Sequence, residues 1–170
     1  MRLGKWIWIG LVIVMLVCIT GFLFRGTVDN PVNENAGITS FSYSHSGSST
    51  MEIYSYEVEK DEETGEMQVE YDLFCGYQTY TLPADNELVL GLTALVKDYD
   101  LRKWDGFDKS NSLIMDGSGF ELYVTFDDGT RINASGSNSF PEGYGEAADA
   151  IDDLFRGYLK KHGIDPEGGY

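Results

Sequence analysis

Hydrophobic residues recur at every second position over several stretches of the chain, and this period predicts β-strands. Ile38 to His45 alternates aromatic residues with serines, and Met51 to Lys60 carries tyrosines and a valine on one face. Met67 to Cys75 alternates cleanly after the acidic turn DEETGE, so these two segments should pair as a hairpin. Tyr77 to Leu82 either extends that strand past a bulge at Gly76 or starts a new strand.

A second hairpin is predicted later in the chain. Apolar and polar side chains alternate from Phe120 to Phe126. The dipeptide Asp128-Gly129 is typical of a two-residue hairpin turn, and Ile132 and Ala134 then lie on the returning strand.

Two other segments carry apolar residues at a helical period. From Asp85, a predicted N-cap, apolar residues recur three or four positions apart as far as Tyr99. A second apolar stripe runs from Tyr144 to Leu159, with acids near its start and bases near its end, as the helix dipole favours. Gly163 can end this helix.

The combination of hairpins and helices predicts an α+β fold. We expect two amphipathic helices to cover one face of a mainly antiparallel β-sheet. These elements make up a domain of residues 38–163, followed by a flexible tail at 164–170.

The first 25 residues have a different pattern, which predicts a membrane anchor or signal segment. Trp6 to Phe24 is a run of nineteen residues without a charged side chain, long enough to cross a bilayer core of ~30 Å as a helix. The run is longer than a secretory h-region and lacks a small-residue cleavage site, so an uncleaved anchor is favoured. Lipidation at Cys18 is a minority alternative, because Val17 stands where a lipoprotein signal has a small residue.

Flanking charges predict the orientation of this anchor. Arg2 and Lys5 precede the apolar run, whereas only Arg25 follows it closely. Positive residues favour the cytoplasmic side, so the domain is expected outside the cytoplasm, on a single-pass anchor in the cell membrane. Residues 26–37, with the sequence GTVDNPVNENAG, predict a polar linker between membrane and domain.

Charge narrows the range of partners. The chain has 28 acidic residues, 12 Lys or Arg residues and a formal net charge of −16, and every acid lies after the apolar run. Such a field repels polyphosphates, so we expect no nucleic-acid partner. Cations, basic proteins and neutral glycans remain open.

Few residues suggest catalysis or a cofactor. With Cys75 the only cysteine after the apolar run, the domain has no internal disulfide, and this residue is expected in the core. The two histidines, His45 and His162, lack the cysteine neighbours of a zinc site, and no G-x-S-x-G or phosphate-binding loop is present. Acids between Asp98 and Asp116 do not have EF-hand spacing. We therefore expect no catalytic residues, metal or cofactor.

The stretch LRKWDGFDKS, Leu101 to Ser110, is the strongest candidate for a site. In a structural interpretation, its aromatic residues fill the gap between helix and sheet around an Asp-Gly turn. In a functional interpretation, the aromatic rings stack on a ligand and the charged side chains supply polar contacts. The ligand-binding candidates are Trp104, Asp105, Phe107, Asp108 and Lys109. The structural interpretation is favoured.

The second half of the domain carries a series of short motifs in a fixed order. These are WDGF at 104–107 with KS at 109–110, DGSGF at 116–120, FDDGT at 126–130, ASG at 134–136, and PEGY at 141–144, followed by a terminal helix. The series resembles a group of uncharacterised exported proteins of Gram-positive, Firmicutes-type bacteria, which often carry a lipoprotein signal or a membrane anchor. The resemblance implies location and single-domain character without a mechanism.

The leading functional hypothesis is therefore a membrane-anchored extracytoplasmic domain that binds a protein or an envelope glycan without chemistry. One alternative is a cell-envelope hydrolase with paired carboxylates, for which Asp105 and Asp108 are weak candidates. Another is an accessory subunit of a membrane complex, in which Trp6 to Phe24 carries the specificity.

Overall fold

The computed structural model describes residues 33, 36–48, 52–61, 63–73, 77–114 and 117–165. The predictions about Trp6 to Phe24, Cys18, Cys75 and the end of the tail lie outside these residues. Among the residues described, no helix is both long enough and apolar enough to cross a membrane.

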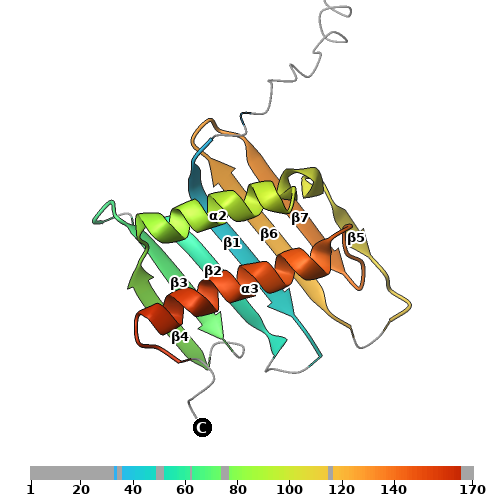
Figure 1. Ribbon diagram of the computed structural model, residues 1–170. Helices are drawn as coiled ribbons and strands as arrows, with labels where there is room; N and C mark the ends of the chain where they lie inside the picture. The colour runs from blue at the N-terminus through green and yellow to red at the C-terminus, as the bar shows by residue number, and fades with distance from the viewer. Residues whose placement is uncertain are drawn as a thin grey trace, which may run out of the picture. The chain divides into compact units, whose positions relative to one another are not determined.

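The domain consists of one mostly antiparallel seven-stranded sheet and two α-helices that lie on the same face of it (Figure 1). The strands are β1 (Ile38–Ser46), β2 (Tyr54–Lys60), β3 (Met67–Leu73), β4 (Gln78–Pro83), β5 (Asp108–Ser110), β6 (Gly119–Phe126) and β7 (Arg131–Ser137). The helices are α2 (Asn86–Asp98) and α3 (Tyr144–Lys161), with a 3-10 turn, η2 (Leu101–Trp104), after α2. The α+β prediction is confirmed.

The strand order is β4-β3-β2-β1-β6-β7-β5, so β1 lies at the centre of the sheet. β1 pairs with β2 on one side and with β6 on the other, and all pairs are antiparallel except β5 with β7. β2 and β3 form the predicted hairpin, and β6 and β7 form the second. Tyr77 to Leu82 does not extend β3; most of it forms a separate strand, β4, antiparallel to β3.

Short polar side chains fix both predicted hairpin turns. Asp61 Oδ1 accepts the backbone N–H groups of Glu63 and Thr64, at 3.0 and 2.7 Å. Asp128 Oδ1 likewise accepts the N–H of Thr130 at 2.9 Å. These bonds satisfy backbone donors that the strand ladder leaves unpaired, so the turn residues set where each strand ends.

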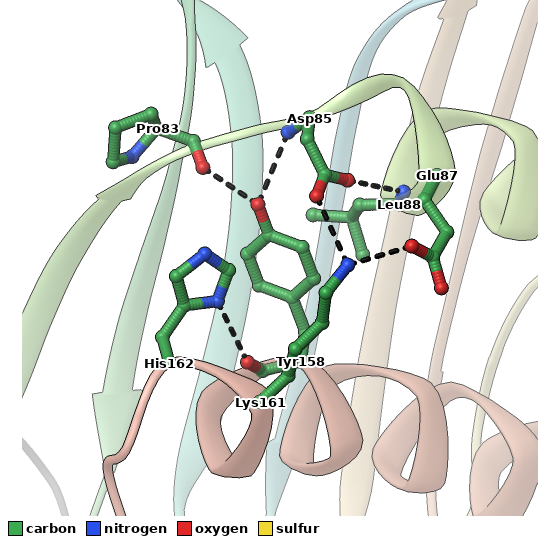
Figure 2. Close-up of polar contacts among 7 residues, drawn as sticks. All are labelled: Pro83, Asp85, Glu87, Leu88, Tyr158, Lys161 and His162. Atoms are coloured by element: carbon green, nitrogen blue, oxygen red, sulfur yellow. Dashed lines mark hydrogen bonds and ion pairs between the residues drawn. The ribbon is translucent and has the colours of Figure 1, made fainter.

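A polar cluster fastens the start of α2 to the end of α3 (Figure 2). Asp85 is the N-cap, as predicted, and its Oδ1 accepts the Leu88 N–H at 2.9 Å. The Tyr158 hydroxyl donates to the Pro83 carbonyl at 2.8 Å and accepts the Asp85 N–H at 3.1 Å. Lys161 Nζ reaches Asp85 Oδ2 at 3.3 Å. The cluster therefore fixes the end of β4 and both helix ends together.

Aromatic residues dominate the core between the helices and the sheet. The Phe155 ring of α3 stacks on Tyr56 with 4.5 Å between ring centroids, and it also contacts Phe41 and Tyr71. The hydroxyl of Tyr56 bonds Asp152 on α3, and that of Tyr43 lies 3.0 Å from the Tyr144 hydroxyl. The buried hydroxyls of Tyr43 and Tyr56 are thus paired, whereas the buried Tyr71 hydroxyl has no hydrogen-bond partner among the described residues.

Candidate functional site

Trp104, the central residue of the predicted candidate segment, belongs to the core. Its side chain is 4% exposed, and its ring lies 5.9 Å from the rings of both Phe120 and Tyr144. The position agrees with the structural interpretation of this residue, because a buried indole offers no face to a ligand.

The Asp105-Gly106 turn clips this segment to β7. Asp105 Oδ1 accepts the Asn133 N–H, and the Gly106 N–H donates to the Asn133 carbonyl, both at 2.9 Å. Gly106 has a φ of 77°, which a residue with a side chain rarely adopts. Asp105 is exposed, but its hydrogen bond has a structural role.

The remaining candidates lie at the sheet edge. Phe107 is half-buried, and Lys109 Nζ lies 5.1 Å from the centre of its ring. Asp108 and Lys109 belong to β5, where both are exposed. Ser135 on β7 donates its hydroxyl to Asp108 Oδ1 at 3.4 Å. Ligand binding by these three residues stays a prediction.

The two faces of the sheet carry different side chains. We call the face under the helices the covered face and the opposite one the open face, since both helices lie on one side (Figure 1). The open face carries mainly hydroxyl, amide and carboxylate side chains, together with Arg131 and an aromatic residue, Tyr123, which is 43% exposed. By strand alternation, its residues include Ser55, Glu57 and Glu59 on β2, Glu70 and Asp72 on β3, Ser42, Ser44 and Ser46 on β1, Glu121 and Tyr123 on β6, and Asn133, Ser135 and Ser137 on β7.

A hollow of about 390 Å³ lies on the open face over β1, β6, β7 and β5. Its lining residues are Ser44, Ser46, Asp108, Lys109, Ser110, Gly119, Phe120, Glu121, Ser135, Gly136 and Ser137. Serine and glycine predominate, and their small size leaves the sheet surface concave. The hollow brings together Asp108 and Lys109, two of the predicted candidates, with serines from β1 and β7.

A second hollow of about 310 Å³ adjoins the first. It is lined by Ser44, His45, Ser46, Ile53, Tyr54, Ser55 and Asp72. Ser44 and Ser46 line both hollows, so the two lie next to each other at β1. Asp72 Oδ1 is buried and has no hydrogen-bond partner among the described residues. A buried carboxylate oxygen without a donor leaves a place for a donor on a ligand or a water molecule.

Cross-strand pairing aligns polar residues of both hollows in a single line. Each neighbouring pair is directly opposite across two strands, in the order Asp72, Ser55, Ser44, Glu121, Ser135 and Asp108. We call these six residues the polar row. At ~4.8 Å between strands, the row spans roughly 24 Å. The arrangement can offer hydroxyl and carboxylate groups to an extended polar ligand.

Acidic residues next to the polar row repel one another. The pKa of Glu57 is raised, chiefly by partial burial and then by the charges of Glu59 and Glu70. No group of three or more His, Cys, Asp or Glu residues in the described ranges is arranged to hold a metal ion. The open face therefore has a negative field that favours neutral or cationic ligands.

Both histidines have structural contacts. His45 stacks on Tyr54 at 5.3 Å, and its Nδ1 lies 3.1 Å from the Tyr144 hydroxyl. Burial lowers the pKa of His45 despite the opposing charges of Glu52 and Asp152. His162 Nδ1 lies 3.0 Å from the Tyr158 carbonyl at the end of α3 (Figure 2).

A scan against protein-family models finds no match to this chain, and a search of curated proteins finds no similar sequence. The function must therefore be argued from the site. One residue of the polar row, Asp108, was a candidate from the sequence, and Lys109 next to it also lines the first hollow, whereas the serines of β1 and β2 were missed. The sequence pattern that could have revealed the β1 serines is their regular alternation with the aromatic residues and His45 in FSYSHS.

Proposed function

We propose that the protein is a membrane-anchored extracytoplasmic domain that binds an envelope glycan without chemical conversion. The observation that supports the proposal is the polar row, which crosses six strands and lines two adjoining hollows. Trp6 to Phe24 supplies the anchor, and the positive residues before it favour the outside location of the domain.

The chemistry of the row suits a neutral or amino-bearing glycan. Serine hydroxyls both donate and accept hydrogen bonds, as sugar hydroxyls do, while carboxylates accept them. Asp72, Glu121 and Asp108 can each pair with a hydroxyl or an ammonium group. An anionic glycan would meet these carboxylates and the net charge of −16.

Tyr123 adds an apolar surface beside the row. It faces the open side of β6, two residues from Glu121, and pairs with Ser42 and Asn133 across the neighbouring strands. An exposed tyrosine ring can stack on a sugar while its hydroxyl stays in water. Aromatic contact and hydroxyl pairing together are the usual components of a small-molecule site.

Glycan binding is tested with the full chain in lipid nanodiscs. The probes are neutral, amino-bearing and carboxylated oligosaccharides of matched length, and the readout is calorimetric titration. We expect binding of the first two classes and none of the third. Absence of binding to every probe contradicts the proposal.

A matched pair of variants locates the site. Ser44→Tyr fills the point that both hollows share, and Glu59→Tyr places the same side chain on the open face at an exposed position of β2, outside both hollows and away from Tyr123. We expect loss of binding in the first variant and its retention in the second. Equal affinities for the two variants would exclude the polar row as the site.

The location is tested separately. A C-terminal alkaline phosphatase fusion is expected to be active in cells, because this enzyme folds only outside the cytoplasm. Replacing Trp6 to Phe24 with an unrelated apolar helix should preserve both location and glycan binding. Loss of function after this exchange would instead favour an accessory subunit whose helix carries the specificity.

A further inference from the structure

The two edges of the sheet differ in how they are protected. β5, at one end of the strand order, has three exposed residues with the sequence DKS, and two of them are charged. β4, at the other end, has six residues, and the stretch from Tyr77 to Ala84 contains no charged side chain. Charged and short edge strands resist pairing with other chains, whereas a longer uncharged edge permits it.

The hydrogen-bond pattern of β3 and β4 shows which backbone groups point outward. The Ala84 N–H donates to the Met67 carbonyl at 2.8 Å, and these residues continue the register of Gln68 opposite Pro83. Hydrogen-bonded and non-hydrogen-bonded pairs alternate along an antiparallel ladder. Leu82, Tyr80 and Gln78 therefore bond toward β3. The backbone groups of Thr79 and Thr81 point away from it.

The end of this edge is closed. Pro83 has no N–H to offer, and its carbonyl already accepts the Tyr158 hydroxyl at 2.8 Å (Figure 2). The same contact holds β4 in place against α3. The edge therefore presents the N–H and C=O groups of two threonines at fixed positions.

The sequence around these groups is symmetric about Tyr80. Thr79 and Thr81 flank it, so a second β4 running antiparallel would place Thr79 of each copy opposite Thr81 of the other copy. The dimer would contain two such pairs. Each Thr pair would exchange two backbone hydrogen bonds, and the two Tyr80 rings would lie side by side. Such pairing uses the same surface on both copies, as a two-fold dimer requires.

We propose that two copies of this chain associate through β4, in an antiparallel pairing centred on Tyr80, to form one continuous sheet. The absence of charge on β4 allows this contact in a chain with a net charge of −16. Because the remaining charges of the two copies repel, added salt should strengthen the dimer. A dimer held by ion pairs would weaken instead.

Charge exchange on β4 tests the register. Thr79 and Thr81 are exposed, so Thr79→Lys with Thr81→Lys, and Thr79→Glu with Thr81→Glu, should leave the fold intact. Each variant alone places like charges opposite each other, and we expect its dimer to be weaker by on the order of tenfold or more. A mixture of the two places Lys opposite Glu and should form a heterodimer.

The measurement uses the full chain in detergent, with light scattering for mass and energy transfer between differently labelled chains. Ser42→Lys with Ser44→Lys is the control, since these residues have the same spacing on the central strand and should leave the dimer unchanged. Circular dichroism checks the fold of each variant. A monomeric wild type, dimers that persist in both β4 variants, or a mixture that does not recover association would overturn the proposal.

Discussion

The covered and open faces of the sheet are built from the same strands, but the covered face packs against the helices and the open face carries the polar row. β1 gives Phe41 and Tyr43 to the covered face, where they are at most 1% exposed, and Ser42 and Ser44 to the open face. From Phe41 to Ser44, the side chains of β1 therefore alternate between packing against the helix layer and facing the side open to a ligand. The two-residue period of a strand separates stability from binding within one sequence.

The largest expected effect on this comparison comes from removing a ring from the covered side. Phe155→Ala deletes the stacking partner of Tyr56 and should lower the free energy of unfolding by about 3 to 5 kcal/mol. Tyr123→Ala, on the open face, should cost less than about 1 kcal/mol. Urea denaturation measures both variants. Similar losses would show that the open face also supports the fold.

Adding a methyl group on the covered face should have an intermediate effect. A Cβ at Gly136 would lie 2.1 Å from the Ser139 carbonyl oxygen and 2.7 Å from the Phe120 ring. We expect Gly136→Ala to cost about 1 to 3 kcal/mol through overpacking. Ser135→Ala, one residue earlier and on the open face, is the control and should change stability little. In the ASG sequence of β7, Ala134 and Gly136 thus lie on the covered face and Ser135 on the open face. A tolerated Gly136→Ala would contradict the close packing.

The helix layer can be loosened at its cap. Asp85→Ala should cost about 1 kcal/mol near neutral pH, because the Leu88 N–H loses its acceptor. The pKa of Asp85 is lowered, first by that N–H and then by Lys161, so its contribution exists above the ordinary value of 3.8 and is lost as pH falls through the folded value. Thermal melting should therefore show the difference between variant and wild type shrinking in acid. A constant difference would contradict this.

The smallest expected effect concerns His45 at the end of the covered face. Its folded pKa lies below 6.5, so the neutral ring is compatible with burial and protonation opposes folding. The stabilisation is complete above pH 6.5 and decreases as pH falls through the folded value. His45→Gln should remove this dependence. Urea midpoints across the acidic range measure it, and parallel curves for both proteins would count against it.

Local patterns predicted much of the fold but not its strand order. The alternation of β1, β2, β3, β6 and β7, both helices and the Asp85 cap were readable, because each is set by neighbours in sequence. β5 was missed, because three residues carry no period and this strand exists only through its pairing with β7. The pairing of β1 with β6 depends on contacts between distant segments, which periodicity does not encode.

The candidate site was predictable only in part for a related reason. Asp108 and Lys109 were candidates because charged residues near aromatic ones suggest a ligand, and both line the first hollow, whereas Trp104 is buried. The serines of the polar row were not candidates, because the pattern of each strand alone gives a serine no partner. Their alignment across six strands arises from register, so the row appears only when the sheet is assembled.

The central position of β1 has a consequence for the order of folding. β1 to β4 form a meander of neighbours, which can assemble soon after they are synthesised. The other edge of β1 can pair only after β6 has been synthesised, since Phe41 pairs with Val124, which is more than half the domain later in the sequence. Pairing over such a separation carries a loop-closure cost and slows folding to roughly the millisecond-to-second range. The first strand to be made therefore gains its second partner only late in folding.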